Sequence, residues 1–101
     1  MKIVVLFNLK AGADAGAYEA WARGVDVPIV RSLPSVADFN VYRAVGLFGS
    51  AEPAPYQYVE IIEARDGGAF ATDAAGEKVR ALAEEFGRFA DNPKFLVVEE
   101  L

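Results

Sequence analysis

Residues 2–10 read KIVVLFNLK, and this stretch decides the fold. Five apolar residues follow one another without a polar residue between them, and Asn8 ends the run. A strand with one face in water alternates apolar and polar residues. The same loss of alternation recurs in FLVV, residues 95–98. Two strands, one near each end of the chain, are therefore expected to be covered on both faces.

The composition is that of one globular domain spanning residues 1–101. Hydrophobic residues make up 53% of the chain and charged residues 25%, so a packed core is expected. The net charge of −5 argues against nucleic acid and against an anionic membrane surface as partners. No apolar run reaches the roughly 20 residues of a spanning helix. The first residues show no signal-peptide pattern, so the chain is expected to be cytoplasmic.

The chain contains neither cysteine nor histidine. Thiolate nucleophiles, zinc sites built from Cys and His, and the commonest general base are thereby excluded. A carboxylate-bound magnesium ion stays formally open, but no tight Asp/Glu cluster supports one. Phosphate-loop and dinucleotide-binding fingerprints are also missing. We therefore expect no metal and no cofactor, and any chemistry must come from carboxylates, Tyr, Arg, Lys, Ser, Thr or the backbone.

Hydrophobic periodicity predicts strands and helices in the order β-α-β-β-α-β. Asp14 is expected to cap the first helix and Asp26 its second part, while Gly76 breaks the second helical region and Asn92-Pro93 stops it. Helix-surface ion pairs are expected between Glu19 and Arg23 and between Glu84 and Arg88. The predicted strands are residues 2–9, 36–46, 56–64 and 94–100, and the predicted helices are residues 15–24, 26–32 and a broken region from 66 to 92.

This order is the ferredoxin-like α+β pattern, with two helical regions covering one face of a four-stranded antiparallel sheet. The other face then exposes apolar side chains of the first and last strands. A second copy of the same sheet, packed face to face, is the simplest cover and creates a dimeric α+β barrel. The alternative is that these apolar residues are tolerated in water.

Several short motifs carry a family resemblance over essentially the whole chain. They are YEAWAR (residues 18–23), DVPIV (26–30), LPSV (33–36), PYQYVEIIE (55–63) and FADNPKF (89–95). In these motifs the chain resembles the REDY-like (HapK-type) protein family. The resemblance implies a dimeric α+β barrel and a place in the secondary metabolism of prodigiosin-type pigments or related aromatic alkaloids. It implies no catalytic residues.

Glu60, Arg43 and Tyr58 form the first candidate site. If the second and third predicted strands pair around the 46–55 loop, Arg43 lies opposite Tyr58 in one register and opposite Glu60 in another. In both registers the three side chains share a face. Glu60 is the candidate general acid or base, Arg43 would hold an anionic oxygen, and Tyr58 would donate a proton or hydrogen bond. The alternative is a surface ion pair worth about 0–1 kcal/mol.

Four further residues are candidates. Asn8, at the end of the first apolar run, would donate to an oxyanion in a cavity, or else it satisfies backbone groups. Tyr18 and Trp21 share the apolar face of the first helix, where they belong to the core or stack on a flat aromatic ligand. Phe48 lies in the loop GLFGSAEPAP, residues 46–55, and would either close a cavity or pack on a partner subunit.

Three functions remain open from the sequence. The first is a cofactor-independent enzyme that uses acid/base chemistry to cyclise or condense a hydrophobic aromatic small molecule. The second is a non-catalytic protein that binds a hydrophobic pathway intermediate. The third is a structural or regulatory dimer, which requires a filled interior. An apolar cavity with a few convergent polar groups would favour the first two over the third.

Overall fold

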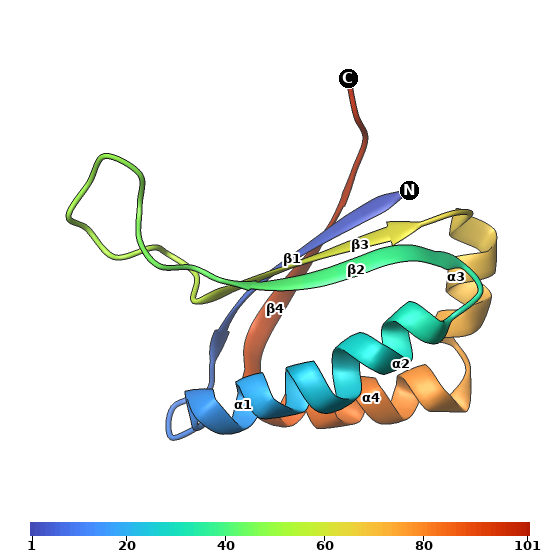
Figure 1. Cartoon of the computed structure of the whole chain (residues 1–101), viewed down its shortest axis with the longest axis horizontal. Coiled ribbons are helices and arrows are strands. Elements are labelled where there is room, and N and C mark those ends of the chain that lie inside the picture. Colours follow the sequence, from blue (N-terminus) through green and yellow to red (C-terminus); the bar gives the residue numbers. More distant parts are fainter.

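The computed structural model describes all residues, 1–101, and confirms the βαββαβ order (Figure 1). One group of helices follows the first strand, and a second group follows the third strand. The elements are β1 (Lys2–Leu9), α1 (Ala15–Trp21), the π-helical turn η1 (Ala22–Asp26), α2 (Val27–Ser32), β2 (Val36–Arg43), β3 (Tyr58–Ala64), α3 (Gly67–Ala74), α4 (Glu77–Phe89) and β4 (Ala90–Val98). None of the helices is both long and apolar enough to span a membrane.

The four strands form one antiparallel sheet in the order β2-β3-β1-β4. The helices lie on one face of this sheet, as the cartoon shows (Figure 1). In the β2–β3 pair, Arg43 lies opposite Tyr58 and Val41 opposite Glu60. The first of the two predicted registers is therefore the correct one. The ferredoxin-like α+β fold is confirmed.

The core lies between the helices and the sheet. Ile3, Val5 and Phe7 of β1 point into it and are 9%, 0% and 0% exposed. Phe7 packs against the rings of Tyr18 and Phe86, with centroids 5.5 and 4.9 Å away. The alternate residues of the KIVVLF run face the other side of the sheet, because successive strand side chains point to opposite faces.

The face of the sheet turned away from the helices carries an apolar centre. The pairing places Val4 between Ile61 and Leu96, and Leu6 beside Val59. Polar residues surround this centre, among them Lys2, Asp38, Asn40, Glu63 and Lys94. The apolar stretch of β1 therefore does supply both faces of the sheet, as the sequence predicted, and no element of this chain covers the second one.

Several helix boundaries follow local sequence signals. Asp14 and Asp66 accept hydrogen bonds from the amides of Ala17 and Ala69, each at an N-cap. The break between α3 and α4 occurs at Gly76, as predicted. The predicted gap between the helices 15–24 and 26–32 is instead a π-helical turn, and α1, η1 and α2 form one continuous rod (Figure 1).

Strand β4 begins earlier than the sequence suggested. The helix stops at Phe89, and the chain pairs with β1 from Ala90 onward, so Asn92 and Pro93 lie inside the strand rather than ending the helix. Asn92 has a φ of 45°, close to where the register with β1 shifts. Proline is tolerated there because β4 is an edge strand, where a missing amide donor costs little.

Candidate functional site

The centre of β3 carries a buried glutamate. Glu60 is 5% exposed and lies on the helix-covered face of the sheet, between the core residues Tyr58 and Ile62. The Tyr18 hydroxyl on α1 donates a hydrogen bond of 3.2 Å to Glu60 Oε2. Tyr18 itself is completely buried. The predicted acid/base candidate is therefore inside the domain and not on a wet sheet face.

A second carboxyl lies close enough to influence Glu60. Asp26 is 6% exposed and belongs to η1, the π-helical turn that joins α1 to α2. The prediction that Asp26 caps a helix is wrong, because its backbone is helical and its side chain makes no capping hydrogen bond. Turns of this kind occur frequently at functional sites, since they change the direction in which one side chain projects.

Both carboxyls line a cavity of about 270 Å³ between the sheet and the helices. They are its only titratable lining residues. The remaining twelve are apolar: Ile3, Val30, Leu33, Phe39, Ile62, Phe70, Ala74, Val79, Leu82, Ala83, Phe86 and Phe95. An apolar space with a small number of convergent polar groups is the usual form of a small-molecule site.

Burial changes the titration of this pair. Loss of hydration and then the nearby Asp26 charge raise the pKa of Glu60, while the Tyr18 hydrogen bond lowers it, and the net pKa is about 8. Burial alone raises the pKa of Asp26 to about 7. Burial, and then the Glu60 charge, also raise the pKa of Tyr18, which stays protonated as a donor. Near neutral pH the two carboxyls are therefore able to gain and lose protons.

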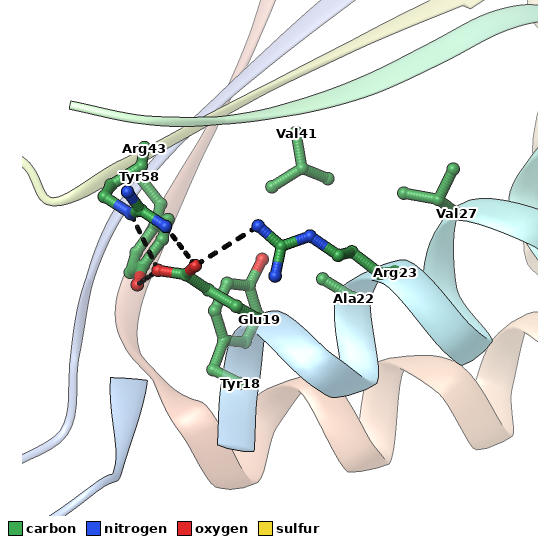
Figure 2. Close-up of a pocket in the computed structure, with 8 residues that line it drawn as sticks. All are labelled: Tyr18, Glu19, Ala22, Arg23, Val27, Val41, Arg43 and Tyr58. Atoms are coloured by element: carbon green, nitrogen blue, oxygen red, sulfur yellow. Dashed lines mark hydrogen bonds and ion pairs between the residues drawn. The ribbon is translucent and has the colours of Figure 1, made fainter. Parts of the chain in front are cut away.

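Arg43 belongs to a different cluster, next to this cavity. Figure 2 shows Glu19 of α1 between Arg43 and Tyr58 on one side and Arg23 on the other. Arg43 makes a two-pronged contact to the Glu19 carboxylate, with Nε 2.9 Å from Oε2. Tyr58 Oη donates to the same carboxylate over 2.8 Å, and Arg23 lies 3.6 Å from it. Hydrogen bonds from Arg43 and Tyr58 lower the pKa of Glu19 to about 2.

The predicted contact between Arg43 and Glu60 is therefore absent. Arg43 lies two positions along β2 from the residue opposite Glu60, and its guanidinium reaches the helix instead of the neighbouring strand. There the guanidinium of Arg43 pairs with the Glu19 carboxylate. The predicted constellation is divided into a paired, ionised cluster around Glu19 and an unpaired acidic pair in the apolar cavity.

Asn8 has the backbone role that was the alternative in the sequence interpretation. Its side-chain carbonyl accepts from the Gln57 amide at 2.9 Å, and its amide donates to the Pro55 carbonyl at 3.3 Å. The side chain of Gln57 in turn accepts from the Leu9 amide. Asn8 therefore ties the end of β1 to the returning 44–57 loop, and it does not line the cavity of Glu60.

Trp21 and Phe48 also lie outside that cavity. The Trp21 indole donates to Glu85 Oε2 at 2.5 Å and packs against Phe86, so it joins α1 to α4. Phe48 is fully exposed and belongs to the loop between β2 and β3, which projects beyond the sheet (Figure 1). Within one chain it therefore closes nothing.

The sequence interpretation gave two functional candidates, Asp26 and Glu19, mainly other roles. Asp26 follows Tyr18 by eight residues and Ala22 by four, so helical spacing places all three on one buried face. That spacing was a usable signal, although Pro28 suggested a cap instead. Glu19 was predicted only as the partner of Arg23, a pair that the structure confirms at 3.6 Å. Its contact with Arg43 joins residues 24 positions apart and had no local signal.

No group of three or more acidic side chains is placed to hold a metal ion. The acid pair of Glu60 and Asp26 falls short of such a group. The chemistry that the arrangement offers is proton transfer and hydrogen bonding inside an apolar space.

Comparison with solved structures shows the same fold across the full chain. A crystal structure of HapK from Hahella chejuensis is 33% identical and has a TM-score of 0.74, covering 100% of this chain and 93% of that one. An ethyl tert-butyl ether d (ethd) family protein from Bacillus halodurans is 18% identical, with a TM-score of 0.77 and coverage of 99% and 97%. SnoaB from Streptomyces nogalater, described as a cofactor-independent oxygenase, is 17% identical, with a TM-score of 0.69 and coverage of 99% and 93%.

The last two likenesses concern the fold alone. No curated protein matches the chain. The family profile of REDY-like protein HapK matches residues 1–101. This match and the 33% sequence identity to HapK show that the chain belongs to the REDY-like HapK family.

Proposed function

We propose that this protein is a cofactor-independent enzyme of small-molecule biosynthesis in which Glu60 transfers a proton to or from a substrate held in the cavity. The observation that carries the proposal is the pair of buried carboxyls in an otherwise apolar space. A glutamate whose pKa is about 8 exists in both protonation states near neutral pH, which suits a general acid or base.

The lining of the cavity supports a hydrophobic aromatic substrate. The elements β2, α3, α4 and β4 contribute the rings of Phe39, Phe70, Phe86 and Phe95, and aromatic rings favour offset or edge-on contact with another ring. Tyr18 would hold the Glu60 carboxylate in place by its hydrogen bond. We propose acid/base-assisted cyclisation or condensation as the reaction, in prodigiosin- or alkaloid-type pigment biosynthesis, the setting that the resemblance to the HapK family implies. SnoaB, described as a cofactor-independent oxygenase, supports the view that this fold accommodates chemistry without a cofactor.

A non-catalytic role as a binder of a hydrophobic intermediate is the second candidate. The small number of polar groups in the cavity favours it, since twelve of the fourteen lining residues are apolar. The purely structural dimer, in contrast, requires a filled interior, and the cavity argues against it.

Replacing Glu60 by glutamine separates the two roles. We expect Glu60→Gln to lower product formation at least 100-fold, because general acid–base groups contribute about 10²–10⁴ in rate. The measurement is metabolite analysis of the native host carrying the chromosomal substitution, beside the wild type and a deletion strain that identifies the dependent product.

Glu63→Gln is the matched control, because Glu63 is an exposed glutamate on the same strand and faces away from the helices. It should leave product formation unchanged. Wild-type product levels in the Glu60→Gln strain would eliminate Glu60 as the acid or base and leave the binding role.

We also propose that a second copy of the chain covers the open face of the sheet. The support is the apolar centre around Val4 and Leu6 with a polar surround, the arrangement expected of a specific interface. One of the structurally similar proteins, from Thermobifida fusca, is described as a dimeric ferredoxin-like protein. In such a dimer the fully exposed Phe48 would have a partner surface to pack on, which favours the second of its two predicted roles.

The dimer is tested by light scattering at micromolar concentration. The wild type should show twice the chain mass of 10.9 kDa. Val4→Glu should give the monomer mass or aggregate, because a charge in the middle of a desolvated interface costs several kcal/mol. Glu63→Lys changes charge at the edge of the same face and should stay dimeric. A monomeric wild type would refute the proposal.

A further inference from the structure

The charged side chains that line the cavity are all acidic. Its polar surface belongs to two carboxyls, Glu60 and Asp26, and it contains neither a lysine nor an arginine. Glu60 receives one hydrogen bond, from Tyr18. Asp26 is only 6% exposed, and its carboxyl makes no hydrogen bond and opens into the cavity. Ionised carboxylates accept about four hydrogen bonds each, so most of this accepting capacity is unused.

Three arginines between α1 and β2 are engaged elsewhere. Arg23 and Arg43 pair with Glu19. Arg31 donates to the Phe39 carbonyl and to the Asn40 side chain. A buried charge is normally paired with an opposite charge or is neutralised by a proton. In this protein the two carboxyls have no cationic partner, so protons neutralise them until a ligand arrives.

We infer that the cavity takes an aromatic ligand that carries a basic nitrogen, whose charged N–H group is bound between Glu60 and Asp26. This inference rests on the proposed function, because it assumes that the cavity is the ligand site. The ligand would supply both the donors and the positive charge that the protein lacks. Its ring would occupy the apolar part of the cavity, against the phenylalanines.

The size of the cavity limits the ligand. The volume of about 270 Å³ lies just below the roughly 300–1,000 Å³ typical of small-molecule sites. One or two fused rings with a short side chain fit this range. Phe95 lies at its border and is 60% exposed, so a larger ligand would extend past Phe95 toward the edge of the sheet.

Binding of a cation should be linked to proton release. The groups that face the pair are the Tyr18 hydroxyl from α1 and, behind it, Tyr58 from β3. The lining residues from α3, α4 and β4 are all apolar. With carboxyl pKa values of about 7 and 8, a cationic ligand must displace protons at pH 6 but fewer at pH 8. Its affinity should rise at least 10-fold over that interval.

The probe is 2-naphthylmethylamine, an aliphatic amine that remains charged at pH 8, and its neutral counterpart is 2-naphthylmethanol. Calorimetry on the full protein should show the amine binding at least 10-fold more tightly than the alcohol at pH 8. The preference should disappear in Glu60→Gln combined with Asp26→Asn, while the affinity for the alcohol stays within a few-fold. Glu63→Gln should keep the preference.

Each alternative result has a distinct meaning. Equal affinities of the two probes, or tighter binding of the alcohol, would refute the cation site but leave the cavity as a ligand site. Failure of both probes to perturb NMR signals of Phe39 and Phe86 would refute this inference and remove the cavity from the proposed function. A clear preference for the amine, together with full product formation by Glu60→Gln in the host, would support the cation site and refute the catalytic role.

Discussion

Glu60→Gln should make the protein more stable at pH 8, by about 2 kcal/mol. Raising the pKa of a buried carboxyl from 4.5 to about 8 corresponds to a penalty of up to roughly 5 kcal/mol for the ionised form. The glutamine is neutral at all pH values and still accepts from the Tyr18 hydroxyl. Its buried amide lacks a partner, which costs about 1–3 kcal/mol. A net gain near 2 kcal/mol would raise the melting temperature of a domain this size by about 8–16 °C.

The stability of Glu60→Gln relative to the wild type should increase as the pH rises. Because the folded protein holds the Glu60 proton more tightly than the unfolded chain, the contribution of Glu60 to wild-type stability is fully present below about pH 4.5 and is lost as the pH rises toward 8. Glu60→Gln lacks this decline. At pH 4.5, where the penalty is nearly absent, the variant should be less stable than the wild type by about 1–3 kcal/mol.

Urea unfolding at pH 4.5 and pH 8, at one protein concentration, measures both values. The effect of Asp26→Asn on the free energy of unfolding should change sign between the two pH values in the same way, since the pKa of Asp26 is raised to about 7. The exposed Glu63→Gln should change stability by less than about 0.5 kcal/mol at either pH. A Glu60→Gln protein that is destabilised equally at both pH values would show that Glu60 is not held in an unfavourable charged state. Such a gain in stability on removing a functional group is typical of active sites.

Phe7→Ala should have the largest destabilising effect, about 3–5 kcal/mol. Phe7 is completely buried and contacts three aromatic rings, with Tyr58 stacked at 5.5 Å, Tyr18 edge-on at 5.5 Å and Phe86 edge-on at 4.9 Å. The total stability of small domains is about 5–15 kcal/mol, so the loss would take a large part of it. Urea unfolding at pH 7 and a fixed protein concentration provides the measurement.

Phe95→Ala is the matched control, because it removes the same ring from a side chain that is 60% exposed. Burying a whole phenylalanine contributes about 1.5–3 kcal/mol, so this variant should lose no more than about 1 kcal/mol. If both variants lost the same amount, the core would not be centred on Phe7. Loss of the Phe7 ring also removes packing that holds Tyr18, and the Tyr18 contact to Glu60 should loosen with it.

Local patterns determined the fold. The unbroken apolar run around Val4 and Leu6 predicted a strand with two apolar faces, and the order of the elements predicted the sheet with helices on one side. Asp14 and Gly76 marked a helix start and a helix break because caps and breaks depend on neighbouring residues. Strand alternation placed Arg43, Tyr58 and Glu60 on one face but left two registers open, and the structure has Arg43 opposite Tyr58.

Tertiary structure alone decided how the charged side chains combine. The sequence predicted Glu60 as a candidate, yet it placed Arg43 with Glu60, since strand pairing was the only visible relation between them. In the folded chain Arg43 contacts Glu19, and Glu60 shares its cavity with Asp26. The physical reason is that strand alternation and helix caps depend on nearby residues. A charged side chain instead joins the best partner in space, and packing of α1 and η1 against the sheet brings that partner into reach.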